Sequence, residues 1–361
     1  MTTATENGWS LTVNDAITGR FRAHIESADS TWSTSIQGDG TSTETIVTND
    51  ADRPWEPGEI DSTFEGNSRL IVRWWGDTPV YAHKIDEYDY DLDAGKLKVQ
   101  ASDLIGEADW RLIDGVGADK FSALTVVNRS ASGALRAILA RMMQWGPDWE
   151  YPIDLPPDGA GDISATWEFW EKYRISDLIG QIEDRSNSEL FLRVYSPGDR
   201  DIRFEAVVGA PIVRDRVSFK LHADETPLSG VKYRKSRRSQ VTGIHGVGNG
   251  TGVDQETRWA GEPRGPIRDT KQTFPDLTGE ALQQTVTRYY QANADPRAQW
   301  TVGSFTISDE YPPMLALPGT RWDIESIGRQ PIPDGDHAMR VIKLSGGNGY
   351  ELKTEVQDAA A

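Results

Sequence analysis

The stretch that decides the fold lies in the last third of the chain and reads Val241-Thr242-Gly243-Ile244-His245-Gly246-Val247-Gly248-Asn249-Gly250. It is typical of a β-strand that runs into a glycine-rich turn. A single helix is predicted after it, over residues 278–294, and strands return at 320–324, 339–344 and 350–357. No recognisable catalytic constellation accompanies this order of elements. The pattern therefore favours a structural protein.

The first 120 residues are predicted to be β-structure. Residues 80–102 form a predicted hairpin whose turn is the Asp/Gly-rich stretch 91–95. In its second strand, Leu97 and Val99 alternate with polar residues, which indicates one buried and one wet face.

Residues 121–210 have a mixed pattern. Leu135, Ile138, Leu139 and Met142 follow the spacing of one helix face. A second helix is predicted after Ser176 as its N-cap, and a hairpin is predicted over residues 189–208. Residues 146–161 are predicted as a loop, 166–170 as extended chain and 299–308 as a strand. Residues 211–361 return to β-structure, apart from the helix at 278–294. The sequence thus predicts a mainly β fold with an α+β insertion, divided at 1–120, 121–210 and 211–361.

The chain is strongly acidic. It has 361 residues, with 56 acidic against 38 basic side chains and a formal net charge of −18. Such a surface repels nucleic-acid phosphates, so general DNA binding is not expected, although it suits a channel through which DNA slides. No cysteine is present, which excludes disulfides and thiolate sites. No secretory signal and no membrane-spanning run is recognised, so the protein is expected to be made soluble in a cytoplasm.

Several motifs imitate chemical sites, but each fits a simpler interpretation better. Asp89, Asp91 and Asp93 resemble the start of a calcium loop, yet Gln100 stands where a bidentate Glu is needed. A hairpin turn explains these aspartates better. The glycines at 246–250 could suggest a phosphate cradle, but no helix follows them directly, so a loop after a strand is favoured. The five histidines are not at metal-ligand spacing. We therefore predict no catalytic residue, no metal and no cofactor, although a hydrolase that uses dispersed carboxylates stays an open alternative.

Two groups of residues are candidates for contact with other molecules. The first is a basic cluster in this acidic chain, which we interpret either as a solvated strand or as an assembly interface that docks on an acidic neighbour: Lys232, Arg234, Lys235, Arg237 and Arg238. The second is the pair Trp145 and Trp149, which lie in a predicted loop and are candidate contact-surface aromatics. Trp74 and Trp322 fall in strand patterns and are predicted to be buried.

Three segments together resemble the baseplate hub or minor tail proteins of long-tailed bacteriophages. The hairpin "GDTPVYAHKIDEYDYDLDAGKLKVQASDL" resembles a strand pair of the hub. The segments "SGALRAILARMM" and "RISDLIGQIEDRSNSELFLRVY" resemble its inserted helical module, and "VTGIHGVGNGTG", "LPGTRWDIES" and "HAMRVIKLS" resemble its second barrel. The resemblance spans nearly the whole chain.

This resemblance implies two tube-like β-barrel domains, at 1–120 and 211–361, with a small α/β module at 121–210 between them. It also implies a homotrimeric, pseudo-sixfold ring at the phage tail tip of the virion, without enzymatic activity. The implied partners are further copies of the chain, the distal tail or tail tube protein, the tape measure protein, and other minor tail proteins or fibres, with DNA only as passing cargo. We expect receptor binding and any wall cleavage to come from other proteins. The alternative is a tail-tip adhesin that binds host glycan through Trp145 and Trp149.

Overall fold

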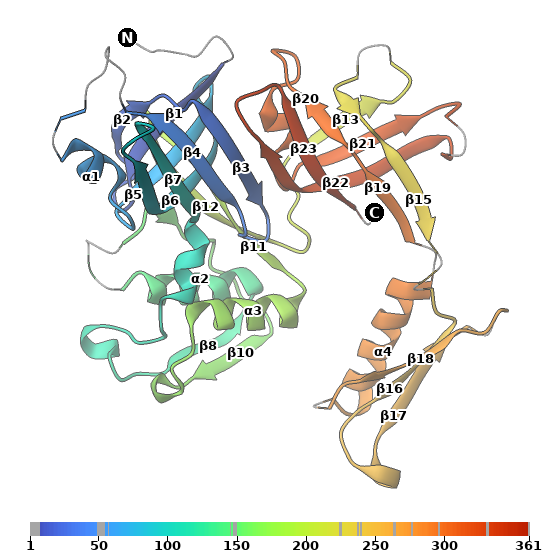
Figure 1. The fold of residues 1–361 in the computed structure, drawn as a ribbon. Coiled ribbons are helices and arrows are strands. Elements are labelled where there is room, and N and C mark those ends of the chain that lie inside the picture. Colours follow the sequence, from blue (N-terminus) through green and yellow to red (C-terminus); the bar gives the residue numbers. More distant parts are fainter. Residues whose placement is uncertain are drawn as a thin grey trace. The chain divides into compact units, whose positions relative to one another are not determined.

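The computed structural model describes residues 8–48, 55–56, 58–144, 146, 150–223, 226–236, 238, 240–262, 265–275, 277–294, 297–329 and 332–359. The chain forms two compact units (Figure 1). The first unit combines Met1–Gly230 with Val302–Ala361, and the second is Val231–Thr301. The division into domains at 1–120, 121–210 and 211–361 stays a proposal.

A 13-stranded sheet organises the first unit. Seven of its strands come from the N-terminal part of the chain: β1 (Trp9–Asp15), β2 (Phe21–Ile25), β3 (Asp29–Ser35), β4 (Thr41–Val47), β5 (Arg69–Trp75), β6 (Thr78–Asp91) and β7 (Lys96–Asp103). They lie in the order β2-β1-β5-β6-β7-β4-β3, and each neighbouring pair is antiparallel. A short helix, α1 (Glu59–Phe64), precedes β5 in the chain.

The other six strands of this sheet come from the last 150 residues. They are β13 (Arg216–Lys220), β14 (Leu228–Ser229), β20 (Ser304–Thr306), β21 (Arg321–Ser326), β22 (Gly335–Gly346) and β23 (Glu351–Asp358). The sheet continues as β3-β22-β23-β20-β14, while β21 pairs with β22 and, in parallel, with β13. Residues about 300 positions apart become neighbours where β3 meets β22, with Lys343 opposite Ser35. The predicted mainly β fold is confirmed.

The hairpin of β6 and β7 follows the predicted pattern. Asp91 pairs with Lys96 at its end, and the Asp91 carboxylate accepts a hydrogen bond of 2.9 Å from the Ala94 N–H. Gly95 has a φ of 59°, in the left-handed region that glycine adopts without strain. Leu97 and Val99 are buried, and Lys96 and Lys98 are exposed. The aspartates here thus serve a turn.

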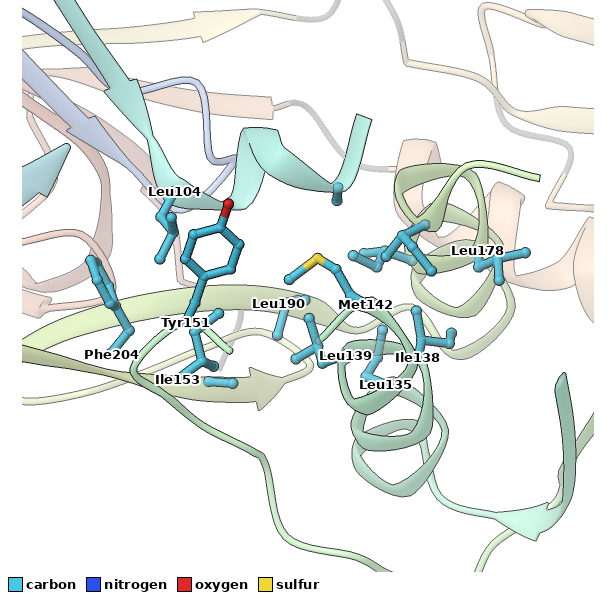
Figure 2. Close-up of a cluster of buried hydrophobic side chains, with 14 of the residues drawn as sticks. Leu104, Leu135, Ile138, Leu139, Met142, Tyr151, Ile153, Leu178, Leu190 and Phe204 are labelled. Atoms are coloured by element: carbon cyan, nitrogen blue, oxygen red, sulfur yellow. The ribbon is translucent and has the colours of Figure 1, made fainter. Parts of the chain in front are cut away.

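The helical module of the first unit buries the predicted apolar face. Its elements are α2 (Ala131–Met142), α3 (Ile175–Ser186), β8 (Leu124–Arg129), β9 (Ile153–Asp154), β10 (Ile163–Trp167), β11 (Glu189–Gly198) and β12 (Asp201–Gly209). Figure 2 shows Leu135, Ile138, Leu139 and Met142 of α2 gathered in one buried cluster with Leu178 of α3. All four α2 side chains are fully buried. Each contributes about 1.5–3 kcal/mol of hydrophobic stabilisation, enough to hold short helices that would not persist alone.

Several predicted details of the first unit are wrong. Helix α3 begins one residue before Ser176, after Arg174, whose N–H is bonded at 3.1 Å by the Asp177 carboxylate. The predicted loop at 146–161 contains β9, which pairs in parallel with β12. The predicted extended stretch at 166–170 ends at Trp167, and a turn of 3-10 helix begins at Phe169.

The 3-10 segments of the described residues, over both units, are η1 (Leu104–Asp109), η2 (Gly117–Asp119), η4 (Phe169–Glu171), η5 (Gly252–Asp254) and η6 (Pro313–Ala316).

The second unit is smaller, and its described residues form two sheets. In this part of the chain β15 (Lys232–Ser236) pairs with β19 (Arg297–Thr301) alone, and β16 (Gly243–Val247) lies between β17 (Thr257–Gly261) and β18 (Asp269–Thr273). The single helix α4 (Gly279–Ala294) confirms the one predicted over 278–294, and it packs on β16 and β17. The predicted strand at 299–308 is in fact divided between β19 and β20. Leu282 belongs to the small buried core of this unit, and Leu277 packs against that core.

The described part of the chain contains no helix that is both long and apolar enough to cross a membrane. Trp74 and Trp322 are fully buried, as predicted from their strand patterns. Trp322 stacks on Phe305 with 5.7 Å between ring centroids, and its indole N–H donates to the Leu315 carbonyl at 2.7 Å. Both tryptophans therefore serve the core rather than a surface.

Candidate assembly surfaces

Three members of the basic cluster lie on one strand of a two-stranded ribbon. Lys232, Arg234 and Lys235 belong to β15 and are exposed. Within the described residues, none of these three side chains has a carboxylate within ion-pair distance, and no further strand pairs with β15. The ribbon thus offers three uncompensated positive charges on a strand with a free edge, which is a suitable place for an acidic neighbour to dock.

An aromatic pair holds this ribbon in place. Tyr233 stands opposite Trp300 in the register, and their ring centroids are 4.9 Å apart. Trp300 is only 7% exposed. Because side chains alternate along a strand, Tyr233 and Lys235 point to one face and Lys232 and Arg234 to the other. Lys232 and Arg234 therefore lie on the same face of the ribbon.

The remaining two members of the basic cluster differ from these three. Arg238 is exposed, and its backbone carbonyl accepts a hydrogen bond of 2.7 Å from the Arg268 guanidinium. Arg237 lies outside the described residues. The structure thus brings three of the five predicted residues together on one strand and places Arg238 in the turn after it.

The glycine-rich stretch is used for helix packing rather than for binding phosphate. A Cβ on Gly246 would lie 1.9 Å from Val286 Cγ2 of α4, and one on Gly248 would lie 2.6 Å from Leu282 Cδ2. After Gly248 the chain turns back, with Glu256 N–H bonded to the Asn249 carbonyl at 3.0 Å. These glycines let the helix approach the sheet closely.

The face of the second sheet opposite α4 carries residues that sequence reasoning did not single out. His245 stands between Trp259 on β17 and Lys271 on β18 in the register. Trp259 is 42% exposed, and His245 and Lys271 are exposed. The sequence did offer a signal for this surface. The apolar residues Ile244 and Ala260 are adjacent in sequence to His245 and Trp259, and side chains alternate along a strand. If Ile244 and Ala260 are buried, His245 and Trp259 must lie on the opposite face of the sheet. This half-exposed aromatic surface is a second candidate contact surface.

The histidines stay separate, and the buried one is structural. His83 is fully buried, with Nδ1 3.1 Å from Ser42 Oγ and Nε2 3.3 Å from Asp103 Oδ1. Tyr81 stacks on His83 and donates to Glu44 Oε1 at 2.8 Å. Burial, with the charge of Glu44 beside it, raises the pKa of Tyr81 well above its ordinary value. Among the described residues, no group of three or more His, Asp or Glu side chains could hold a metal ion.

The two tryptophans proposed as glycan contacts, Trp145 and Trp149, lie outside the described residues. Their proposed role as contact-surface aromatics thus stays a prediction.

The comparisons with known proteins concern the fold of the whole chain. No protein-family model and no curated sequence matches it. A tail protein from Neisseria meningitidis MC58 aligns over 98% of this chain and 97% of its own, with a TM-score of 0.57 and 11% identity. The 43 kDa tail protein of prophage MuSo2 from Shewanella oneidensis aligns over 96% of this chain and 97% of its own, with a TM-score of 0.61 and 10% identity.

A Francisella PdpA–VgrG complex contains a further similar structure. It aligns over 97% of this chain but only 57% of its own, with a TM-score of 0.56 and 9% identity. At such identities the likeness concerns the fold. Both tail proteins match from end to end, so this chain has the fold of phage tail proteins.

Proposed function

We propose that this chain is a structural component of a phage tail tip, and that three copies form a pseudo-sixfold hub ring. The ring joins the tail tube to the tip and encloses the channel for the tape measure protein and for DNA during host entry. The observation that carries the proposal is the likeness to two bacterial and prophage tail proteins over 96–98% of the chain. The partial match within a PdpA–VgrG complex is consistent with a place in a multi-protein assembly.

Charge and surface features support a role in assembly. The net charge of −18 fits a channel whose walls do not hold DNA. Within this acidic chain, Lys232 and Arg234 form a basic strip on β15, which fits an acidic surface on a neighbouring copy or a neighbouring tail protein. The proposed assembly interface thus consists of Lys232, Arg234 and Lys235, with Arg237 and Arg238 beyond them.

Cryo-electron microscopy of the intact particle tests the ring directly. We expect three copies of this chain around an open channel at the end of the tail. Copies that project outward from the tip without enclosing a channel would contradict the hub and would favour the adhesin alternative.

A charge reversal tests the interface. Lys232→Glu combined with Arg234→Glu should reduce incorporation of the protein into particles, because two attractive contacts become repulsive. The matched control is Lys96→Glu with Lys98→Glu, two exposed basic residues at the same spacing on β7. Incorporation is measured by quantitative immunoblotting of purified particles, and circular dichroism confirms that both variants fold. Equal incorporation of the two double variants would remove β15 from the interface.

A further inference from the structure

A pocket of about 660 Å³ lies within the first unit. Its walls come from the β11–β12 hairpin, from residues 154–157, from the start of β6 and from the segments around 214 and 314–317. This volume is in the range that small ligands or a short peptide segment occupy. Apolar side chains, including Leu155, Met314 and Leu317, form part of the lining, and five charged side chains form another part.

The acidic side chains of the pocket are already neutralised. Each of the three carboxylates has its own arginine: Asp77 with Arg200 at 3.1 Å, Asp154 with Arg203 at 2.5 Å, and Glu205 with Arg193. Asp154 also accepts a hydrogen bond from the Tyr195 hydroxyl. Of the charged side chains that line the pocket, only Arg214 is left without a counter-ion among the described residues. The pocket and its ion pairs therefore carry one excess positive charge, in a chain with a net charge of −18.

The environment of Arg214 is unfavourable for a charged side chain. Its Nε is buried without a hydrogen-bond partner, although its backbone N–H donates to the Gly319 carbonyl at 2.8 Å. Burial, and next to it the charge of Arg193, lowers the pKa of Arg214 to about 10, so the guanidinium stays protonated at neutral pH. Asp215 offsets this in part, but it is exposed and does not line the pocket. A desolvated cation beside a second cation destabilises the folded chain, and such arrangements are expected where a ligand is bound.

We propose that this pocket binds one carboxylate group, which Arg214 receives through its guanidinium. A planar guanidinium matches a carboxylate in a bidentate arrangement. The single excess charge fits a monoanion, whereas a phosphate dianion would meet the three carboxylates that already line or approach the pocket. The apolar walls would pack on the carbon chain that bears the carboxylate. This inference does not depend on the hub ring.

Two sources could supply the carboxylate, namely a free small acid or an acidic side chain on an extended segment of another protein chain. The probes are pentanoate, which carries one carboxylate, its neutral counterpart pentanamide, and the blocked peptide acetyl-Ala-Leu-Glu-Leu-Ala-amide with its glutamine counterpart. Binding to the full-length protein is measured by isothermal titration calorimetry. We expect pentanoate and the glutamate peptide to bind, and the neutral counterparts to bind at least tenfold more weakly. A glutamate peptide that binds tenfold more tightly than pentanoate identifies a protein segment as the source, and the reverse order identifies a free acid.

Substitutions separate a binding role of Arg214 from a structural one. Arg214→Gln should weaken carboxylate binding about tenfold to a hundredfold, the range for the loss of a charged hydrogen bond. Its thermal midpoint should be unchanged or higher, because the variant removes a partly buried charge that has no counter-ion among the described residues. Arg216→Gln is the matched control, since Arg216 lies two residues away, is bonded to Asp323 and does not line the pocket. Asp323 keeps Arg321 as a partner at 3.1 Å.

Thr78→Trp gives a second, independent test, because Thr78 is exposed at the pocket wall and a large side chain there would occupy the pocket. It should abolish binding of both acidic probes while Arg214 is intact. Equal binding of pentanoate and pentanamide would overturn the proposal. So would unchanged pentanoate binding in Arg214→Gln, or in Thr78→Trp if Arg214→Gln does not fold.

Discussion

An ion pair between Glu189 and Arg340 connects the helical module to the C-terminal strands of the first unit. Arg340 on β22 donates through both terminal nitrogens to the Glu189 carboxylate, with Nη2 2.8 Å from Oε1. The carboxylate also accepts a hydrogen bond of 3.0 Å from the Ile212 N–H, and Arg340 donates to the Ile212 carbonyl at 3.3 Å and to Gln357 Oε1 at 3.1 Å. The side chain of Arg340 is 4% exposed and that of Glu189 is 32% exposed. The pair thus joins residues 151 positions apart in a largely buried network.

Glu189→Gln should lower the free energy of unfolding by about 2–3 kcal/mol. Removal of one partner of a fully buried ion pair costs about 3–5 kcal/mol, because the other charge is left uncompensated. Here the cost is reduced, since Glu189 is partly exposed and glutamine keeps one oxygen that accepts a hydrogen bond. For a unit of this size, with about 2–4 °C lost for each kcal/mol, the thermal midpoint should fall by about 4–12 °C.

The effect should depend on pH. Burial acts to raise the pKa of Glu189, but hydrogen bonds from Arg340 and the Ile212 N–H outweigh it and hold the pKa below its ordinary value. A carboxyl with a lowered folded pKa adds stability that is fully present above its unfolded pKa of about 4.3 and is lost as the pH falls through the folded pKa. The difference between wild type and Glu189→Gln should therefore be largest at neutral pH and should shrink in acid.

Glu183→Gln is the matched control on the same segment. Glu183 accepts a hydrogen bond of 2.7 Å from the Leu190 N–H. Burial, with the charges of Glu189 and Asp184, raises its pKa. An acid with a raised folded pKa gains stability as the pH falls through that pKa, so its charge is a cost at neutral pH. We expect Glu183→Gln to leave the midpoint unchanged or to raise it slightly at pH 7.

Urea titrations at pH 7 and at pH 3.5, followed by near-ultraviolet circular dichroism and by tryptophan fluorescence, measure these differences. Coincident transitions from the two probes are needed before a free energy is assigned, because the chain has two units. A Glu189→Gln variant within about 0.5 kcal/mol of wild type at pH 7 would refute the reasoning, since that range is typical of surface substitutions. A double-mutant cycle with Arg340→Met then isolates the coupling between the two side chains.

Two further substitutions test packing and buried charge elsewhere. Gly246→Ala should destabilise the second unit by about 1–3 kcal/mol, because the new Cβ would meet Val286 Cγ2, and Val286→Ala in the same chain should restore part of the loss. The measurement is hydrogen exchange of the β16 and α4 amides, and unchanged protection would contradict the close approach. Glu44→Gln should cost about 2–4 kcal/mol in a urea titration, since Arg73 is 3% exposed and would lose the carboxylate 3.6 Å from its Nη1. A thermal midpoint equal to wild type would show that Asn348, at 2.5 Å, is a sufficient partner for Arg73.

Local patterns in the sequence were sufficient to predict elements that carry their own signal. The spacing of Leu135, Ile138, Leu139 and Met142 is a property of one helix, and burial of all four confirms it. The hairpin of β6 and β7 was equally accessible, because Asp91 and Gly95 mark its turn. The same local logic failed for the start of α3, where Asp177 bonds the Arg174 N–H although Ser176 is the better cap by type.

Long-range pairings had no such signal. Nothing in the residues of β3 and β22 indicates that Ser35 would stand opposite Lys343, because many strands satisfy period-two alternation equally well. The Arg214 pocket and the Glu189–Arg340 pair likewise depend on contacts between residues that are far apart in the sequence. The basic cluster was visible as composition, but only the pairing of β15 with β19 showed that Lys232 and Arg234 share a face. The sequence thus shows that the segment is basic, but only the strand pairing shows which of its basic side chains lie on the same face.

The combination of about 10% identity with end-to-end structural likeness has a physical explanation. The architecture depends on which positions are apolar and on the register between strands, and a large number of sequences meet those conditions. Chemistry specific to this chain must then lie where a residue departs from what packing alone requires. Two sites meet that description: the exposed positive charges of β15 in an acidic protein, and the partly buried guanidinium of Arg214, whose Nε is buried without a hydrogen-bond partner. If both were only consequences of folding, replacing Arg214 by Gln would lower stability and reversing the charges on β15 would leave assembly unchanged. If both sites are instead selected for binding, replacing Arg214 by Gln should leave stability unchanged or raise it, and reversing the charges on β15 should impair assembly. In that case the stability that each site costs the isolated chain is recovered when the partner binds.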